Sequence, residues 1–377
     1  MTTIAQQAML ARAVMRAITL AAFLAASAAP AAPATVSQSY ADRPDVSAFI
    51  DEMVADHGFD ARALRRFFAK VRYQQSVINA MSRPALEPPK WYQYASQFLS
   101  ASRIDGGVAF WRANAATLQR AQDEFGVPAE IVVAIIGVET LYGRNAGSYR
   151  VADALTTLAF DYPRRAEYFR NELKQFLLQT REQKISPLAP KGSYAGAQGL
   201  PQFMPSSLRD YAVDYDNDGK IDLAADIDDA VGSVANYLAW HGWQTGEPVM
   251  KPASIDVDKR DEVERMLDGG ISDRRPLESW QRDGVNVTGT GESASGTRES
   301  ASGIPESPPR IGESAASIPE SSGADSVGVL MLEEEGEPSY WVVFNNWYVL
   351  TRYNRSRLYA SAVWSLAQEL KRAFTGQ

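Results

Sequence analysis

The chain of 377 residues contains no cysteine and only two histidines, His57 and His241. Disulfide bonds, cysteine nucleophiles and zinc–thiolate sites are therefore excluded, and so is a metal site built from several histidines. The folded state must be stabilised by packing or by a bound ion. A lipid-anchored N-terminus is not expected either, because that modification needs a cysteine at the cleavage point.

Positive charge is in short supply as well. The chain has 38 Lys and Arg residues against 46 Asp and Glu residues, a formal net charge of −8. A protein that binds nucleic acid needs a basic face, so we expect no nucleic-acid partner. The hydrophobic share of 45% is typical of a soluble globular protein.

After the first 34 residues, no segment is apolar enough to cross a membrane. Within those 34 residues, Arg12 and Arg16 precede an alanine-rich apolar stretch, and small residues follow it. This pattern predicts a secretory signal peptide over residues 1–34 and hence export to the periplasm. An uncleaved anchor is the alternative, but the run is short for a membrane span. We therefore expect no stable membrane anchor.

A second unusual stretch, residues 286–326, is rich in Ser, Gly, Pro and Glu and repeats itself. Glu-Ser-Ala-Ser-Gly occurs at 292 and 299, and Ile-Pro-Glu-Ser occurs at 304 and 318. Such a composition buries too little apolar surface to fold, which predicts a disordered insertion. We expect ordered structure to resume at Tyr340, followed by a helix from about Ser356 to Ala373.

The remaining sequence is mostly helical in pattern, including residues 45–116 and Val231–Trp240. The most informative segment is the apolar run Ile131–Val138, which is followed by Glu139. Pro128 is a favourable start for this helix and Gly143 a plausible end. Glu139 then lies in the last turn.

At that position two effects raise the pKa of the Glu139 carboxyl. Apolar surroundings disfavour its charged form, and so does the negative end of the helix dipole. Such a carboxyl can hold a proton near neutral pH and deliver it to a leaving oxygen. The alternative is an exposed Glu on an otherwise buried helix.

Several separated motifs accompany this helix: Gly137–Thr140, Lys191–Ala197, Gly199–Ser207, Ala235–Leu238 and Thr351–Ser356. Together and in this order they resemble the B-type lytic murein transglycosylases, periplasmic enzymes that cleave the glycan strands of peptidoglycan. The resemblance runs from about Asp45 to Gly246 and resumes from Tyr340 to about Phe374.

The resemblance implies a mainly α fold with a lysozyme-like catalytic core, a helical N-terminal region and a small β-containing part. The expected parts are a signal peptide (1–34), a helical N-terminal region (35–116), the catalytic core with an EF-hand-like loop (117–250), a small β-containing part (251–285), a disordered insertion (286–326) and a C-terminal segment that completes the cleft (327–377).

Most glycoside-cleaving sites use two carboxylates, but Glu139 has no convincing second, since Asp153 and Asp161 lie in segments without another active-site signal. The resemblance implies that Glu139 protonates the oxygen between N-acetylmuramic acid and N-acetylglucosamine. It then deprotonates the C6 hydroxyl of the same muramoyl sugar, which gives a 1,6-anhydro product without water.

The resemblance also implies residues that bind the sugar. Ser193 and Gln202 are polar residues in segments expected to line the cleft, where they can bind N-acetyl or hydroxyl groups. The other matching positions are Tyr94, Tyr237, Tyr353, Asn354 and Tyr359. Tyrosine rings suit the apolar C–H faces of sugars, although tyrosine is also common in cores. Simple helix packing is the alternative for the glycine-rich 196–207 segment.

The segment Asp214–Lys220 matches the first half of an EF-hand calcium loop. Asp214, Asp216 and Asp218 provide oxygen ligands at every second residue, and Lys220 provides a backbone carbonyl. Ala225 replaces the usual Glu at position twelve. The resemblance implies that Asp229 closes the site, with Asp226 or Asp228 as substitutes. The prediction is a structural Ca²⁺, with no cofactor for catalysis; a solvated acidic turn is the alternative.

The sequence therefore predicts a periplasmic lytic transglycosylase whose partners are peptidoglycan glycan strands, with other cell-wall enzymes as further candidates. A muramidase that uses water and a non-catalytic peptidoglycan-binding protein are the alternatives. An acid in an apolar pocket argues against the second of these, because a binding module has no need of one.

Overall fold

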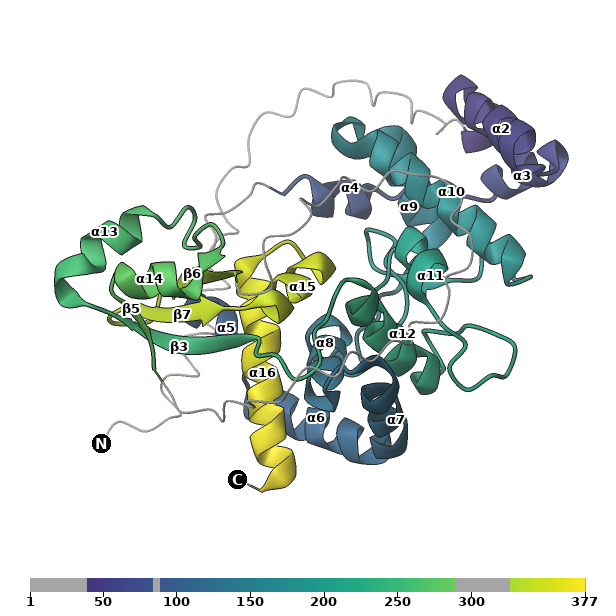
Figure 1. Cartoon of the computed structure of the whole chain (residues 1–377). Coiled ribbons are helices and arrows are strands. Elements are labelled where there is room, and N and C mark those ends of the chain that lie inside the picture. Colours follow the sequence, from purple (N-terminus) through teal and green to yellow (C-terminus); the bar gives the residue numbers. More distant parts are fainter. Residues whose placement is uncertain (1–38, 84–88, 289–325, 377) are drawn as a thin grey trace, which may run out of the picture. The chain divides into compact units, whose positions relative to one another are not determined.

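The computed structural model describes residues 39–83, 89–288 and 326–376 (Figure 1). Helices predominate, as expected, and the strands form a two-stranded and a five-stranded sheet. The predicted signal peptide and residues 289–325 of the low-complexity tract lie outside the described residues.

One group of helices is built around the buried helix α9 (Val151–Asp161). Its other members are η1 (Tyr40–Asp42), α2 (Pro44–His57), α3 (Ala61–Phe68), α4 (Gln75–Met81), η2 (Pro163–Arg165) and α10 (Ala166–Glu182). Apolar side chains of α2, α3 and α4 share one core with those of α9 and α10. In this core the rings of Phe49, Phe68 and Phe160 meet edge to face. The helices at 40–81 thus pack on α9 and α10, far along the chain, rather than on the following helices.

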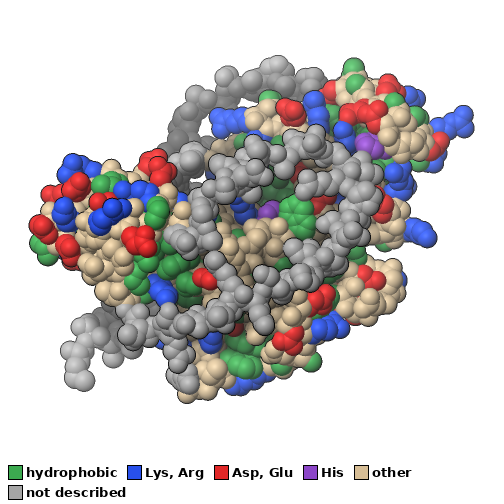
Figure 2. Space-filling model, viewed as in Figure 1, with side chains coloured by type: hydrophobic (Ala, Val, Ile, Leu, Met, Phe, Trp, Pro, Cys, Tyr) green, Lys and Arg blue, Asp and Glu red, His purple; other side chains and the backbone are tan. Residues whose placement is uncertain are grey.

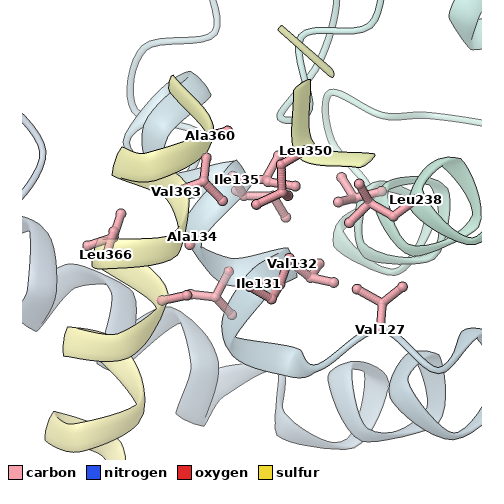
Figure 3. Packing of buried hydrophobic residues seen from close by; sticks show 14 of the residues in the cluster. Val127, Ile131, Val132, Ala134, Ile135, Leu238, Leu350, Ala360, Val363 and Leu366 are labelled. Atoms are coloured by element: carbon pink, nitrogen blue, oxygen red, sulfur yellow. The ribbon is translucent and has the colours of Figure 1, made fainter. Parts of the chain in front are cut away.

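A second, larger core surrounds α8 (Ala129–Thr140), nearly all of whose side chains are buried. Around it lie α5 (Trp91–Ala95), α6 (Ala101–Ala113), α7 (Ala115–Phe125), α11 (Pro205–Tyr211), α12 (Ile227–Trp240), α15 (Asn345–Tyr353) and α16 (Arg357–Thr375). Figure 3 shows Ile131 and Ala134 of α8 beside Val363 and Leu366 of α16. A helix that is apolar on every side can exist in water only when it is enclosed in this way.

Helix boundaries in this core follow from capping. The hydroxyl of Ser356 accepts the backbone N–H of Tyr359 at 3.3 Å, which starts α16, and Gly376 ends it with a left-handed φ of 77°. Asp226 caps α12 by accepting the N–H groups of Asp228 and Asp229. The C-terminal helix of the sequence prediction is therefore confirmed with slightly longer bounds.

The five-stranded sheet is antiparallel, with the order β4 (Arg275–Pro276), β6 (Ser326–Leu332), β7 (Ser339–Val343), β3 (Met250–Ile255) and β5 (Val285–Val287). The short helices η3 (Val257–Lys259), α13 (Arg260–Arg265) and α14 (Leu277–Arg282) complete this part, and Trp280 lies in its small core. The second sheet joins β1 (Tyr149–Arg150) to β2 (Lys191–Gly192).

This sheet corrects two sequence-based boundaries. Regular structure resumes at Ser326 rather than Tyr340. Strand β6 pairs with β7 there, with Leu332 opposite Ser339 and Gly328 opposite Val343. The predicted start of the low-complexity tract at residue 286 is also wrong, because Asn286 and Val287 belong to β5 and pair with β3. The pairing that decides both boundaries is long-range, so the local composition did not reveal it.

Within the described residues, no helix is long and apolar enough to cross a membrane. The face displayed in Figure 2 carries Lys and Arg side chains interspersed with Asp and Glu.

Candidate active site

The helix α8 ends by an unusual turn that fixes the position of Glu139. It begins after Pro128 and ends at Thr140, so the expected stop at Gly143 is corrected. Leu141 and Tyr142 both adopt left-handed φ angles, of 51° and 60°, a conformation that non-glycine residues seldom adopt. The N–H groups of Leu141 and Tyr142 bond the carbonyls of Gly137 and Ile136 at 3.1 and 3.3 Å.

Packing maintains this turn. The hydroxyl of Tyr142 donates to the carbonyl of Arg103 at 3.0 Å, and its ring lies against Gly137. A Cβ at Gly137 would lie 2.7 Å from that ring. Glycine at position 137 of the motif is therefore required by the close approach of Tyr142.

Thr140 links α8 to the glycine-rich segment at 199–203. Its buried hydroxyl donates to the carbonyl oxygens of Ile136, at 3.2 Å, and Leu200, at 3.0 Å, and it accepts the N–H of Gly143 at 3.0 Å. The Leu200 N–H in turn donates to the carbonyl of Leu223 at 2.8 Å. These bonds hold the end of α8 and the second motif together.

Glu139 is half-buried in this last turn, and burial raises the pKa of its carboxyl to about 7. The phenol of Tyr359 donates to Glu139 Oε1 at 2.7 Å and opposes that rise, because it stabilises the charged form. A carboxyl with this pKa is present in both protonation states near neutral pH. It can therefore give up a proton and take one back.

The fully buried carboxyl residues of the described part have structural partners instead. Glu130 pairs with Lys371 at 3.0 Å, Asp153 pairs with Arg150 at 2.5 Å, and Glu172 accepts from the N–H and hydroxyl of Ser206. The fourth, Asp229, belongs to the acidic loop described below. Asp161 pairs with Arg43 at 2.6 Å. Neither Asp153 nor Asp161 faces Glu139 through any of these contacts.

Tyrosines surround the acid. The rings of Tyr359 and Tyr353 are nearly parallel, with centroids 6.4 Å apart, and the Tyr353 ring meets that of Tyr237 edge-on at 5.0 Å. Burial raises the pKa of Tyr353 and of Tyr94, and the charge of Glu139 raises both further, so both phenols lie within its electrostatic reach. Hydroxyl bonds from Tyr353 to the Pro201 carbonyl and from Tyr237 to the Arg352 carbonyl fix the two rings.

The two predicted polar residues lie in tightly bonded loops. Ser193 Oγ accepts the N–H groups of Ala195 and Ala197 at 3.2 and 3.1 Å. Gln202 has a left-handed φ of 53°, and its amide nitrogen donates to the carbonyls of Ala146 and Gly199. Gly199 itself has a φ of 71°, and a Cβ there would lie 2.4 Å from the Leu223 carbonyl oxygen.

Asn354 lies directly after α15 with an exposed side chain, next in sequence to Tyr353. Sequence reasoning missed two supporting residues. Arg103 donates to the Gly137 carbonyl and lies over the ring of Phe98, 5.1 Å from its centroid. Thr140 belongs to the motif Gly137–Thr140, but its role in joining α8 to the glycine-rich segment depends on its hydrogen bond to the Leu200 carbonyl. No local pattern marks a residue whose partners are so distant in the chain.

The acidic loop brings together three carboxylates from two segments. Oxygen atoms of Asp214, Asp216 and Asp229 lie within 4.8 Å of one another, and Asp229 is buried. Asp229 also accepts the N–H groups of Tyr215 and Asp222, both at 2.7 Å. The donor set is all oxygen, which suits a hard cation such as Ca²⁺.

The other candidate ligands have different contacts. Asp226 caps α12, and Asp228 accepts from the hydroxyl of Thr117. Asp218 lies outside the group of three and accepts the N–H of Lys220 at 2.8 Å.

The chain has a lysozyme-like helical fold and, at the end of its buried helix α8, a half-buried acid of raised pKa, as a lysozyme-like transglycosylase requires. The profile of the family described as Transglycosylase SLT domain matches residues 41–368. The membrane-bound lytic murein transglycosylase B of Escherichia coli (strain K12) is 38% identical over 345 residues, which cover 87% of this chain and 83% of that protein. The chain belongs to the lytic murein transglycosylase B family, as its motifs predicted.

Solved structures agree with this assignment. The soluble lytic transglycosylase SltB1 from Pseudomonas aeruginosa is 44% identical, with a TM-score of 0.75, over 89% of this chain and all of that chain. The Escherichia coli lytic transglycosylase Slt35, in a structure with calcium, is 36% identical with a TM-score of 0.74, over 89% of this chain and 95% of that one. The expected mainly α, lysozyme-like fold is thereby confirmed.

Proposed function

We propose that this lytic transglycosylase cleaves the bond between N-acetylmuramic acid and N-acetylglucosamine in peptidoglycan, with Glu139 as both acid and base. The observation that carries the proposal is the Glu139 carboxyl, whose pKa is raised to about 7 and whose neighbours are tyrosines. A hydrolytic glycosidase of the usual kind needs a second carboxylate for its water or its covalent intermediate.

The proposed reaction balances without water. The Glu139 carboxyl gives its proton to the glycosidic oxygen as the bond from that oxygen to C1 breaks. The C6 hydroxyl of the same muramoyl sugar then attacks C1 and passes its proton to the Glu139 carboxylate. The acid is restored, and the product ends in a 1,6-anhydro ring. Tyr359 supports the intermediate stage, because its hydroxyl donates to the charged form.

We assign substrate contacts to Ser193, Gln202, Tyr94, Tyr237, Tyr353, Asn354 and Tyr359. The support is that the phenols of Tyr94, Tyr353 and Tyr359 lie within the electrostatic reach of Glu139. Gln202 follows Pro201, whose carbonyl accepts from Tyr353. Fixed aromatic faces beside polar tips are suited to sugar rings.

We propose further that the acidic loop holds Ca²⁺ through Asp214, Asp216 and Asp229, together with the Lys220 carbonyl. The ion would supply no chemistry to the reaction. It would neutralise three carboxylates that otherwise repel one another and so stabilise the connection between α11 and α12. We propose export to the periplasm from the pattern of residues 1–34, since peptidoglycan lies there.

The central test is digestion of purified sacculi by the wild-type protein and by Glu139→Gln, with mass spectrometry of the products. Wild-type digests should contain muropeptides that end in 1,6-anhydro-N-acetylmuramic acid. Glu139→Gln keeps the shape of the side chain but moves no proton, so activity should fall toward the upper end of the ~10²–10⁴-fold range for acid–base catalysis.

Three results would contradict the proposal. Products with ordinary reducing ends would favour a muramidase that uses water. Substantial turnover by a folded Glu139→Gln protein would show that the acid is another group. Binding of sacculi without any cleavage by the wild type would favour a non-catalytic protein.

A further inference from the structure

Trp240, at the end of α12, is the exposed tryptophan of this chain. Its side chain is 55% exposed, whereas the other seven tryptophans are buried or half-buried. An indole in water loses the favourable burial of a large apolar surface. Exposed aromatic rings on a protein that binds a polymer are therefore candidate contact points.

The Trp240 ring does not stand alone. It meets the ring of Tyr211 at 5.2 Å, and the Tyr211 ring meets that of Tyr237 at 5.0 Å. His241 packs beside both ends of this group, 5.6 Å from Trp240 and 4.3 Å from Tyr237. The group is anchored between helices, because the Asn236 amide donates to the Tyr211 carbonyl at 2.8 Å.

This group continues the aromatic residues around the acid. Tyr237 contacts Tyr353, Tyr353 stacks with Tyr359, and Tyr359 bonds Glu139. A chain of neighbouring rings thus leads from the reacting carboxyl to an exposed indole. Four ring-to-ring steps, of 6.4, 5.0, 5.0 and 5.2 Å, connect Tyr359 to Trp240, so the exposed indole is not among the groups that contact the reacting carboxyl.

Charged groups flank the outer end. Burial raises the pKa of Tyr211, and the nearby Asp210 carboxylate raises it further. Burial lowers the pKa of His241, and the nearby Arg352 guanidinium lowers it further. Carboxylates accept sugar hydroxyls, and guanidinium groups bind the carboxylates that peptidoglycan carries. An apolar face with such polar edges matches a sugar ring better than it matches a purely apolar partner.

We propose that Trp240 and Tyr211 form a remote binding site for the glycan strand, where a β-1,4-linked amino sugar stacks several residues away from the cleaved bond. The site rests on the proposed function. It favours long strands over short ones, because only a long strand reaches from Glu139 to Trp240.

The test measures binding in the inactive Glu139→Gln background, so that the strand is not consumed. Calorimetry measures the binding of long, uncross-linked glycan strands and of a single disaccharide–peptide unit. The two proteins compared are the Glu139→Gln protein and the same protein with Trp240→Ala. We expect Trp240→Ala to weaken binding of long strands about 3- to 10-fold, the range of one aromatic contact, and to leave the short unit unchanged. Trp240→Tyr should restore most of the loss.

A matched control is Tyr73→Ala, which removes another exposed aromatic ring (41% exposed) away from this group. It should change neither affinity. The site would be overturned if proteins with and without Trp240→Ala bound long strands equally. It would also be overturned if Trp240→Ala weakened the binding of both ligands by the same factor. If the Glu139→Gln protein binds no glycan at all, the proposed function itself fails, and this outcome is distinguishable from the other two.

Discussion

At the scale of single residues, the proposed chemistry depends on the balance between burial and one hydrogen bond at Glu139. Burial favours the neutral acid, and the Tyr359 hydroxyl favours the carboxylate. A residue that acts first as acid and then as base needs both forms to be accessible. In the proposed mechanism, the Tyr359 phenol therefore holds the pKa of Glu139 below the value that burial alone would give.

Replacing Tyr359 by Phe removes this hydrogen bond and leaves the ring. The pKa of Glu139 should rise further, so the alkaline limb of the pH profile of kcat/KM should move to higher pH. Loss of positioning should also lower kcat roughly tenfold. The matched control is Tyr353→Phe, whose hydroxyl donates to the Pro201 carbonyl. An unchanged alkaline limb in Tyr359→Phe would show that the phenol does not tune the acid.

The raised pKa also makes stability depend on pH. Because the folded-state pKa is about 7 and the ordinary value is 4.5, the native protein holds more protons between these limits. The wild type should therefore lose stability relative to Glu139→Gln as the pH rises through this window, by roughly 2–3 kcal/mol in total.

Urea unfolding of both proteins at pH 4 and pH 8 measures this difference. The two free energies of unfolding should be similar at pH 4, and the Gln variant should be more stable at pH 8. A difference that is independent of pH would mean that Glu139 titrates normally.

At the scale of elements, the loop between α11 and α12 carries a concentration of negative charge. Asp214 and Asp216 come from one part of the loop, and Asp229 comes from the first turn of α12. A bound cation would join the two segments, and its removal would leave three neighbouring carboxylates unneutralised.

Millimolar Ca²⁺ should therefore raise the melting temperature by mass action, with a gain of about 2.7 kcal/mol at a concentration of 100 Kd. Asp214→Asn with Asp216→Asn should abolish the rise. Asp258→Asn with Asp261→Asn makes the same charge change at exposed positions outside the loop and should keep it. Equal responses of the two double variants would exclude the site.

At the scale of the whole molecule, the five-stranded sheet determines how residues 289–325 can be shortened. Strands β5 and β6 are separated by β3 and β7. All neighbouring strands are antiparallel, so the C-terminal end of β5 and the N-terminal end of β6 lie on the same side of the sheet. With about 4.8 Å between strands, the connection must span roughly 14 Å.

A flexible Gly/Ser linker of about eight residues has an average end-to-end distance near this span. Replacing residues 289–325 by such a linker should leave the melting temperature and the release of anhydro-muropeptides almost unchanged, since loop closure depends weakly on length. A linker of two residues is the contrasting variant and should destabilise the sheet. A marked loss with the eight-residue linker would mean that the native tract contributes to folding or catalysis.

Local sequence determined the features that depend on neighbours along the chain. Helical periodicity and an apolar run located α8 and put Glu139 in its last turn, and alternating aspartates marked the acidic loop. The spacing of polar and glycine residues was enough for the family resemblance. These inferences required only short-range geometry.

Tertiary structure decided the features that join distant segments. Tyr359 reaches Glu139 across 220 positions of the chain. Asp229, in the first turn of α12, lies near Asp214 and Asp216 because the loop folds onto it through the N–H groups of Tyr215 and Asp222. Strand β6 pairs with β7 beyond the low-complexity tract, and Trp240 contacts Tyr211, whose ring meets that of Tyr237. Such contacts depend on how whole elements pack, and packing energy is shared among many side chains rather than recorded at any one position.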